Sequence, residues 1–141
     1  MRQGIQTFFS EAGEAACYGF ALGNVAEEYL KSEIDPDRAL MAGIEEGFIH
    51  YSWDNPDDSD NFYVDHPEGF LKYLTGRKWT VRKEGPDYQP KPGEYLIQRY
   101  ERTQTGQVIG HFRRPNWDSL VNSVTVRCGQ IVSTRVCALA E

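Results

Sequence analysis

The chain has 141 residues and a formal net charge of −6 at pH 7. This length is most simply one domain, 1–141, and it buries roughly 68–70% of the unfolded surface, enough for a hydrophobic core without disulfides or metals. The negative charge argues against nucleic acid as a partner, because binding a phosphate backbone depends on clustered Lys and Arg. The chain has one local group of basic residues, Arg99, Arg102, Arg113 and Arg114. These arginines are spread over two expected strands and interrupted by Glu101, so they do not change this expectation.

The cysteines and the N-terminal segment narrow the class of protein further. Three cysteines, Cys17, Cys128 and Cys137, leave one unpaired in any disulfide scheme. Cys128 and Cys137 flank a short expected hairpin and could face each other, but a disulfide framework normally uses more cysteines in even number, so burial as small hydrophobic residues is favoured for both. No cysteine–histidine spacing indicates zinc, and we expect neither a metal nor a cofactor. The N-terminus lacks the apolar segment of a signal peptide, and no run approaches the roughly 18 apolar residues of a membrane span. We therefore expect a soluble cytoplasmic protein with no membrane partner. The sequence does not determine its oligomeric state.

The first part of the chain predicts two helices. Within residues 11–31, apolar residues recur with helical spacing and form one stripe: Tyr18, Leu22, Val25 and Tyr29. The pattern leaves open whether this helix begins at Glu11 or near Ala15. A second helix begins at Pro36, where Asp35 caps it, and ends at Gly47.

An acidic, irregular segment follows at residues 48–65, with one short strand at 62–64. Its acidic run, 54–61, lacks the central glycine and the final glutamate of an EF-hand calcium loop. A solvated surface loop is therefore favoured over a calcium site.

The second half predicts one more helix and then a sheet. The helix begins at Pro67 and ends at Gly76. Runs rich in β-branched and aromatic residues, separated by turn residues, predict five strands: 79–82, 95–102, 108–113, 124–127 and 131–138. Short connections favour hairpins, so we expect an α+β fold whose helices pack on one face of a C-terminal antiparallel meander.

Candidate chemistry rests on Cys17, His111 and Asp118, which follow one another in the chain in the order of a papain-type triad. A cysteine near a helix start favours the thiolate, a histidine takes or holds its proton, and an acid orients the histidine ring. Each residue also has a plain structural interpretation. Cys17 is then a packing residue, His111 a core histidine bonded to a carbonyl, and Asp118 a turn cap. His50 and His66 flank loops and are expected on the surface.

Several segments carry a resemblance to a known family: 62–65, 70–82, 110–112, 117–127 and 131–136. They resemble a small bacterial and phage family, a domain of unknown function known from spirochaetes. That family is similar in layout to papain-like peptidases of the bacteriocin-processing type. There a helix with the cysteine precedes a sheet that carries the histidine and then the acid. The resemblance covers nearly the whole chain and is more specific over 62–136.

The resemblance implies a papain-like fold with Cys17 as nucleophile, His111 as base and Asp118 as the residue that orients it. The glutamine that such peptidases place about six residues before the cysteine is Glu11 here. Gln6 or Gln3 is then the candidate to stabilise an oxyanion.

Two classes of function stay open. The first is a cysteine-dependent amide hydrolase or transferase that acts on a peptide or protein through a thioester. Trp117 is then either a wall of the substrate cleft or a residue that closes the sheet edge. The second is a non-catalytic binding or regulatory protein on the same fold, such as a phage-encoded partner of a host protein. The Cys–His–Asp order favours the first. Glu11, with its negative charge, and the six residues between His111 and Asp118 favour the second.

Overall fold

The computed structural model of the protein describes residues 17–51, 62–115 and 129–140. In these three ranges the chain forms helices and strands with the following bounds: α1 Cys17–Leu30, α2 Pro36–Glu45, β1 Ile49–Tyr51, β2 Phe62–Val64, α3 Pro67–Thr75, β3 Trp79–Glu84, β4 Tyr95–Gln104, β5 Gln107–Arg113 and β6 Gln130–Leu139.

Helix ends follow local chemistry. The Asp35 carboxylate accepts hydrogen bonds from the backbone N–H groups of Asp37 and Arg38, and Pro36 occupies the first turn of α2. α3 likewise has a proline in its first turn and ends at Gly76, whose φ of 75° lies in the left-handed region that favours glycine. These signals are readable in the sequence, and both helices form where they predict.

The strands form two antiparallel sheets, a two-stranded ribbon β1–β2 and a four-stranded sheet of order β3-β6-β4-β5. The predicted α+β class is therefore confirmed, but the predicted meander is wrong, because β6 lies between β3 and β4. The connection between those two strands, residues 85–94, is too long for a tight hairpin and leaves room for β6. By contrast, β4 and β5 form a true hairpin. Its two turn residues, Thr105 and Gly106, both have positive φ.

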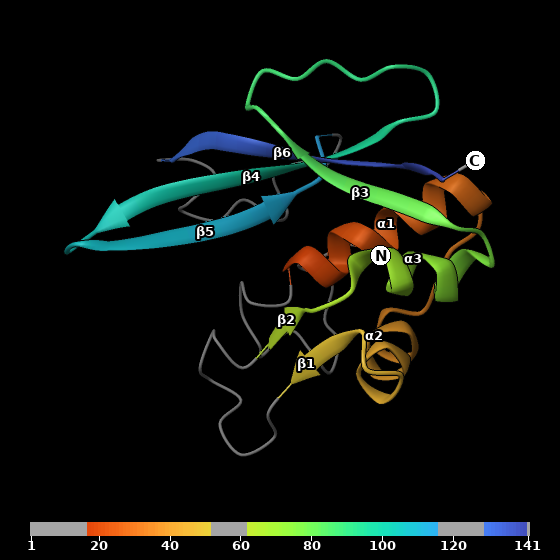
Figure 1. Cartoon of the computed structure of the whole chain (residues 1–141). Coiled ribbons are helices and arrows are strands. Elements are labelled where there is room, and N and C mark those ends of the chain that lie inside the picture. The colour runs from red at the N-terminus through yellow and green to blue at the C-terminus, as the bar shows by residue number, and fades with distance from the viewer. Residues whose placement is uncertain (1–16, 52–61, 116–128, 141) are drawn as a thin grey trace.

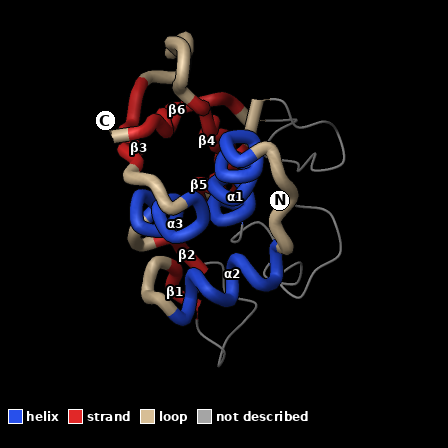
Figure 2. Tube along the Cα trace, turned by 90° about the vertical axis from the view of Figure 1, so that its right-hand side faces the viewer, coloured by secondary structure: helices blue, strands red, loops and turns tan. Residues whose placement is uncertain are grey.

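The elements are arranged in layers. Figure 1 shows α1 and α3 beneath the four-stranded sheet, with α2 and the β1–β2 ribbon beyond them. The side view in Figure 2 shows the same order. One cluster of buried residues joins the layers, with members from the sheet, the two middle helices and the outer layer: Ile97, Cys137, Phe20, Leu22, Phe70, Leu40 and Ile49.

Two other expectations need comment. Residues 49–51 were expected to be irregular, but they form β1, which pairs with β2 through Ile49 and Val64. A three-residue strand is too short to show an alternating pattern, so only its pairing reveals it. The strand predicted at 124–127 lies outside the described residues, as does the acidic run at 54–61.

Candidate functional site

The thiol of Cys17 lies at the edge of the four-stranded sheet. α1, as described, begins at this residue, and β5 is the outer strand on that side of the described sheet. The backbone N–H of Phe112 in β5 donates a buried hydrogen bond to Cys17 Sγ, with 3.1 Å between nitrogen and sulfur. Two segments far apart in the sequence therefore meet at the predicted nucleophile.

This contact also limits how far Cys17 is from His111. The Phe112 nitrogen is two covalent bonds from the Cα of His111, about 2.9 Å at most, so Sγ lies within about 6 Å of that Cα. The structure thus brings the first two predicted triad residues to one place. His111 is buried, with 1% of its surface exposed, and Cys17 has 3% exposed.

The direction of the His111 side chain follows from the strand. Phe112 stacks on Tyr18 of α1, with 4.2 Å between ring centroids. Neighbouring side chains on a strand point to opposite faces, so His111 leaves β5 on the face away from Tyr18. A contact between imidazole and thiol has to be made around the strand edge, where the Cys17 sulfur lies.

The ring of Phe112 is enclosed by cations as well as by Tyr18. The guanidinium carbon of Arg99 lies 4.8 Å from the ring centroid, and that of Arg135 lies 5.3 Å away. Gly110 makes this arrangement possible, because a Cβ there would lie 2.0 Å from Nη2 of Arg99. The guanidinium groups of Arg99 and Arg135 therefore pack against an aromatic ring.

Two titratable groups near α1 are held neutral by their surroundings. Burial raises the pKa of the Cys137 thiol to about 12, while the Arg114 guanidinium opposes this effect and the Glu68 carboxylate adds slightly to it. Burial also raises the pKa of the Tyr18 phenol, with a smaller contribution from Cys137. The interpretation of Cys137 as a buried hydrophobic residue is confirmed, since none of its surface is exposed.

The remaining predicted site residues lie outside the described residues. They are Asp118, Trp117, Gln6, Gln3, Glu11 and Cys128. Their roles stay predictions from the sequence. The expected surface positions of His50 and His66 are confirmed, since both are exposed.

Sequence reasoning missed two features of this region. One is the Phe112 N–H as the donor to Cys17, and the other is the burial of Arg114, which has 5% of its surface exposed. The first depends on which backbone group faces the helix, and the second on a partner in α1, Glu28. Neither leaves a pattern in the local sequence.

Comparison of the chain with protein-family models, with curated proteins and with solved structures finds no match. Across the described residues, no three His, Cys, Asp or Glu side chains gather in a way that would hold a metal ion. In the same part of the chain, every helix is too short or too polar to cross a membrane.

Proposed function

We propose that the protein is a cysteine-dependent amide hydrolase on a papain-like fold, with Cys17 as nucleophile, His111 as base and Asp118 as the residue that orients His111. The observation that carries the proposal is the hydrogen bond from the Phe112 N–H to Cys17 Sγ, which joins the start of α1 to the strand bearing His111. A cysteine helix against an antiparallel sheet with the histidine on a strand is also the layout that the sequence resemblance implies.

The local chemistry suits an anionic sulfur. A backbone N–H aimed at the sulfur stabilises a thiolate, because hydrogen bonds to the charged form favour it.

The proposed reaction has two steps. In the first, the Cys17 thiolate attacks the carbonyl carbon of an amide, the carbon–nitrogen bond breaks, and the imidazolium of His111 gives its proton to the leaving amine. In the second, water attacks the thioester while the imidazole takes a proton from that water. The carbon–sulfur bond breaks, a carboxylic acid leaves, and the thiolate is restored.

A second candidate function, a binding protein without turnover, is favoured by burial. Cys17 and His111 have 3% and 1% of their surfaces exposed. A nucleophile has to reach its substrate, whereas a packing cysteine does not. The reactivity of the thiol therefore decides between the two candidates.

The test is alkylation of the native protein with iodoacetamide at pH 6, followed by mass spectrometry of each cysteine peptide. An ordinary thiol, of pKa about 8.5, is only ~0.3% thiolate at this pH. We expect Cys17 to react about tenfold faster or more than the same cysteine in urea-unfolded protein, and Cys137 not to react. His111→Ala should remove the advantage of Cys17, because the imidazolium favours the thiolate.

Two further variants serve as controls for this test. His50→Ala removes an exposed histidine of β1 and should leave the labelling unchanged. His111→Gln fills more of the buried site than alanine does and serves if the truncated variant unfolds. If native Cys17 does not react, or reacts equally in wild type and both His111 variants, the hydrolase proposal is wrong and the binding protein remains.

A further inference from the structure

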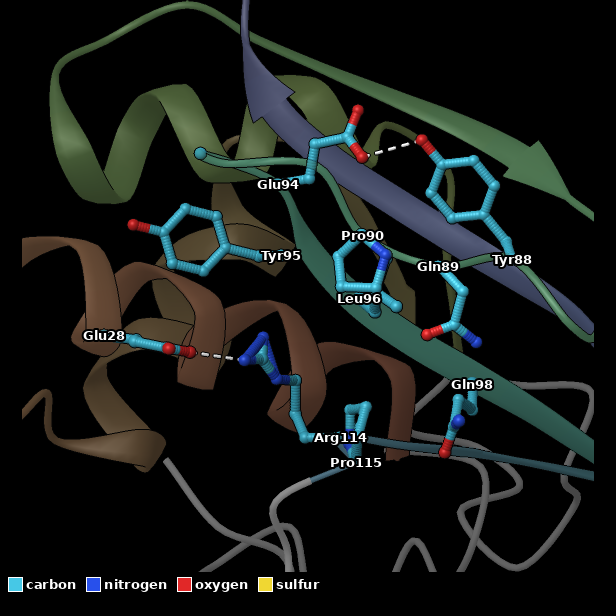
Figure 3. Close-up of a pocket in the computed structure, with 11 residues that line it drawn as sticks. Glu28, Tyr88, Gln89, Pro90, Glu94, Tyr95, Leu96, Gln98, Arg114 and Pro115 are labelled. Atoms are coloured by element: carbon cyan, nitrogen blue, oxygen red, sulfur yellow. Dashed lines mark hydrogen bonds and ion pairs between the residues drawn. The ribbon is translucent and has the colours of Figure 1, made fainter.

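A second site of interest lies at the other end of α1, where a pocket of about 530 Å³ opens between the sheet, the 85–94 connection and the helix. Its volume falls in the range of small-molecule sites. Figure 3 shows Arg114 directed into this pocket from the end of β5, with Glu28 of α1 beside it.

Arg114 is an unusual residue to find in this position. Its side chain has only 6% of its surface exposed, and its Nη2 donates to the Glu28 carboxylate, which is 48% exposed. The Nε and Nη1 groups are buried and have no hydrogen-bond partner. Burial lowers the pKa of this guanidinium, although Glu28 opposes the effect. A buried donor without an acceptor destabilises the protein, and more so when it is charged, so an acceptor brought by a ligand would bind favourably.

On the facing wall of the pocket, the Glu94 carboxylate already has hydrogen-bond donors from the protein. Glu94 accepts hydrogen bonds from the Lys91 N–H at 2.9 Å, the Tyr88 hydroxyl at 2.7 Å and Arg82 at 3.0 Å. Its carboxylate is therefore held in place by protein donors, and Arg82 balances its charge. The Tyr88–Glu94 bond is visible in Figure 3. On the opposite side of the pocket, Arg114 keeps two donors, Nε and Nη1, that have no partner.

The rest of the lining suits a small organic body. Side-chain amides of Gln89 and Gln98 provide donors and acceptors, and Pro90, Tyr95 and Leu96 provide apolar surface. Glu28 and Glu94 both line the pocket, so a dianion such as phosphate meets two negative charges. A carboxylate carries one charge and matches the planar guanidinium.

We propose that this pocket binds a monoanionic carboxylate on a small organic body, held by the unused donors of Arg114. Two sources share this chemistry, a free small acid and the C-terminal carboxylate of a peptide. The proposal does not rest on Cys17 or on hydrolysis.

Calorimetric titration of the full chain tests the proposal with four probes. They are butyrate, N-acetyl-alanyl-alanine, the C-terminal amide of that dipeptide, and inorganic phosphate. We expect at least one of the two carboxylates to bind, and the amide and phosphate to bind about tenfold more weakly or not at all. Butyrate binding alone identifies a free acid as the source, and dipeptide binding alone identifies a peptide end. Equal binding of acid and amide, tighter binding of phosphate, or no binding of either carboxylate overturns the proposal.

Variants test the role of Arg114 in the carboxylate binding. Arg114→Met should abolish it, and Arg114→Lys should weaken it about tenfold, because lysine keeps the charge but loses the planar fork. Glu28→Gln leaves Arg114 in place and removes its competing carboxylate, so it should tighten binding about threefold or more even if the Arg114 variants fail to fold. Arg38→Met removes an exposed positive charge from α2 and should change nothing. Unchanged or weaker binding by Glu28→Gln overturns the assignment.

Discussion

At the scale of single residues, the hydrogen bonds that Glu94 accepts lower the pKa of its carboxyl group. The Glu94 carboxylate accepts from the Lys91 N–H, the Tyr88 hydroxyl and Arg82, in that order of effect, and together they lower its pKa to about 2. The same network holds the 85–94 connection against β3, because Arg82 belongs to β3 and the other partners belong to the connection. A local charge therefore positions one wall of the pocket.

This network predicts a pH dependence. A carboxylate whose pKa is lower in the folded state than in the unfolded state stabilises the protein above its unfolded pKa, here about 4.5. The stabilisation is lost as the pH falls toward about 2. We expect Glu94→Gln to be less stable than wild type at neutral pH and the difference to shrink steadily across that acid range. Urea unfolding at several pH values measures it.

The comparison variant is Glu33→Gln, an exposed carboxylate in the connection between α1 and α2. Its stability should follow that of wild type across the range. A difference between Glu94→Gln and wild type that stays constant down to the acid end would contradict the assigned network.

At the scale of elements, contacts around the aromatic ring of Phe112 hold α1 and the β4–β5 hairpin together. Phe112 stacks on Tyr18 of α1 and lies beneath the guanidinium of Arg99, which crosses over Gly110. The Phe112 N–H binds Cys17 in the same place. The residues that position the proposed nucleophile are therefore the residues that join helix and hairpin.

Gly110→Ala tests this arrangement. The new Cβ would lie 2.0 Å from Nη2 and 2.3 Å from Cζ of Arg99, so the guanidinium has to leave the Phe112 ring. We expect a loss of about 0.5–1 kcal/mol, the size of a cation–π contact. In an Arg99→Ala background the same substitution should cost nothing, because no guanidinium is displaced. A double-mutant cycle by urea unfolding gives the coupling, and equal costs in both backgrounds would refute the steric explanation.

At the scale of the whole molecule, the outer layer of α2 and the β1–β2 ribbon is attached through close packing at Gly43. A Cβ at this position would meet Ile49 Cδ1 at 2.6 Å and Phe70 Cε1 at 2.9 Å. Ile49 and Phe70 are buried, so neither side chain has free space in which to move. Glycine at this point of α2 lets three elements approach one another.

Gly43→Ala should therefore destabilise the protein by about 1–3 kcal/mol, despite the better helix propensity of alanine. Adding Ile49→Val removes the nearest atom and should recover part of the loss. Gly85→Ala is the control, since a Cβ there meets nothing within 4 Å, and its effect should stay within about 0.5 kcal/mol. Chemical unfolding of the four proteins is the measurement. Gly43→Ala as stable as wild type would mean that the layers are less tightly packed than described.

The sequence by itself determined the local features of this protein. Asp35 and Pro36 start α2, and Pro67 and Gly76 bound α3, because capping and turn conformations depend on residues that are neighbours in the chain. The α+β class followed from helical and alternating patterns for the same reason. The order of Cys17 and His111 in the chain was also readable, and it pointed to the place where α1 meets β5.

Only the tertiary structure decided which distant segments pair. The place of β6 between β3 and β4, the pairing of β1 and the hydrogen bond from Phe112 to Cys17 all join segments that are separated in the sequence. The burial of Arg114 against Glu28 is of the same kind. Such contacts depend on how whole faces of helices and sheets fit together, and packing of that kind leaves no periodic pattern in the residues that make the contact.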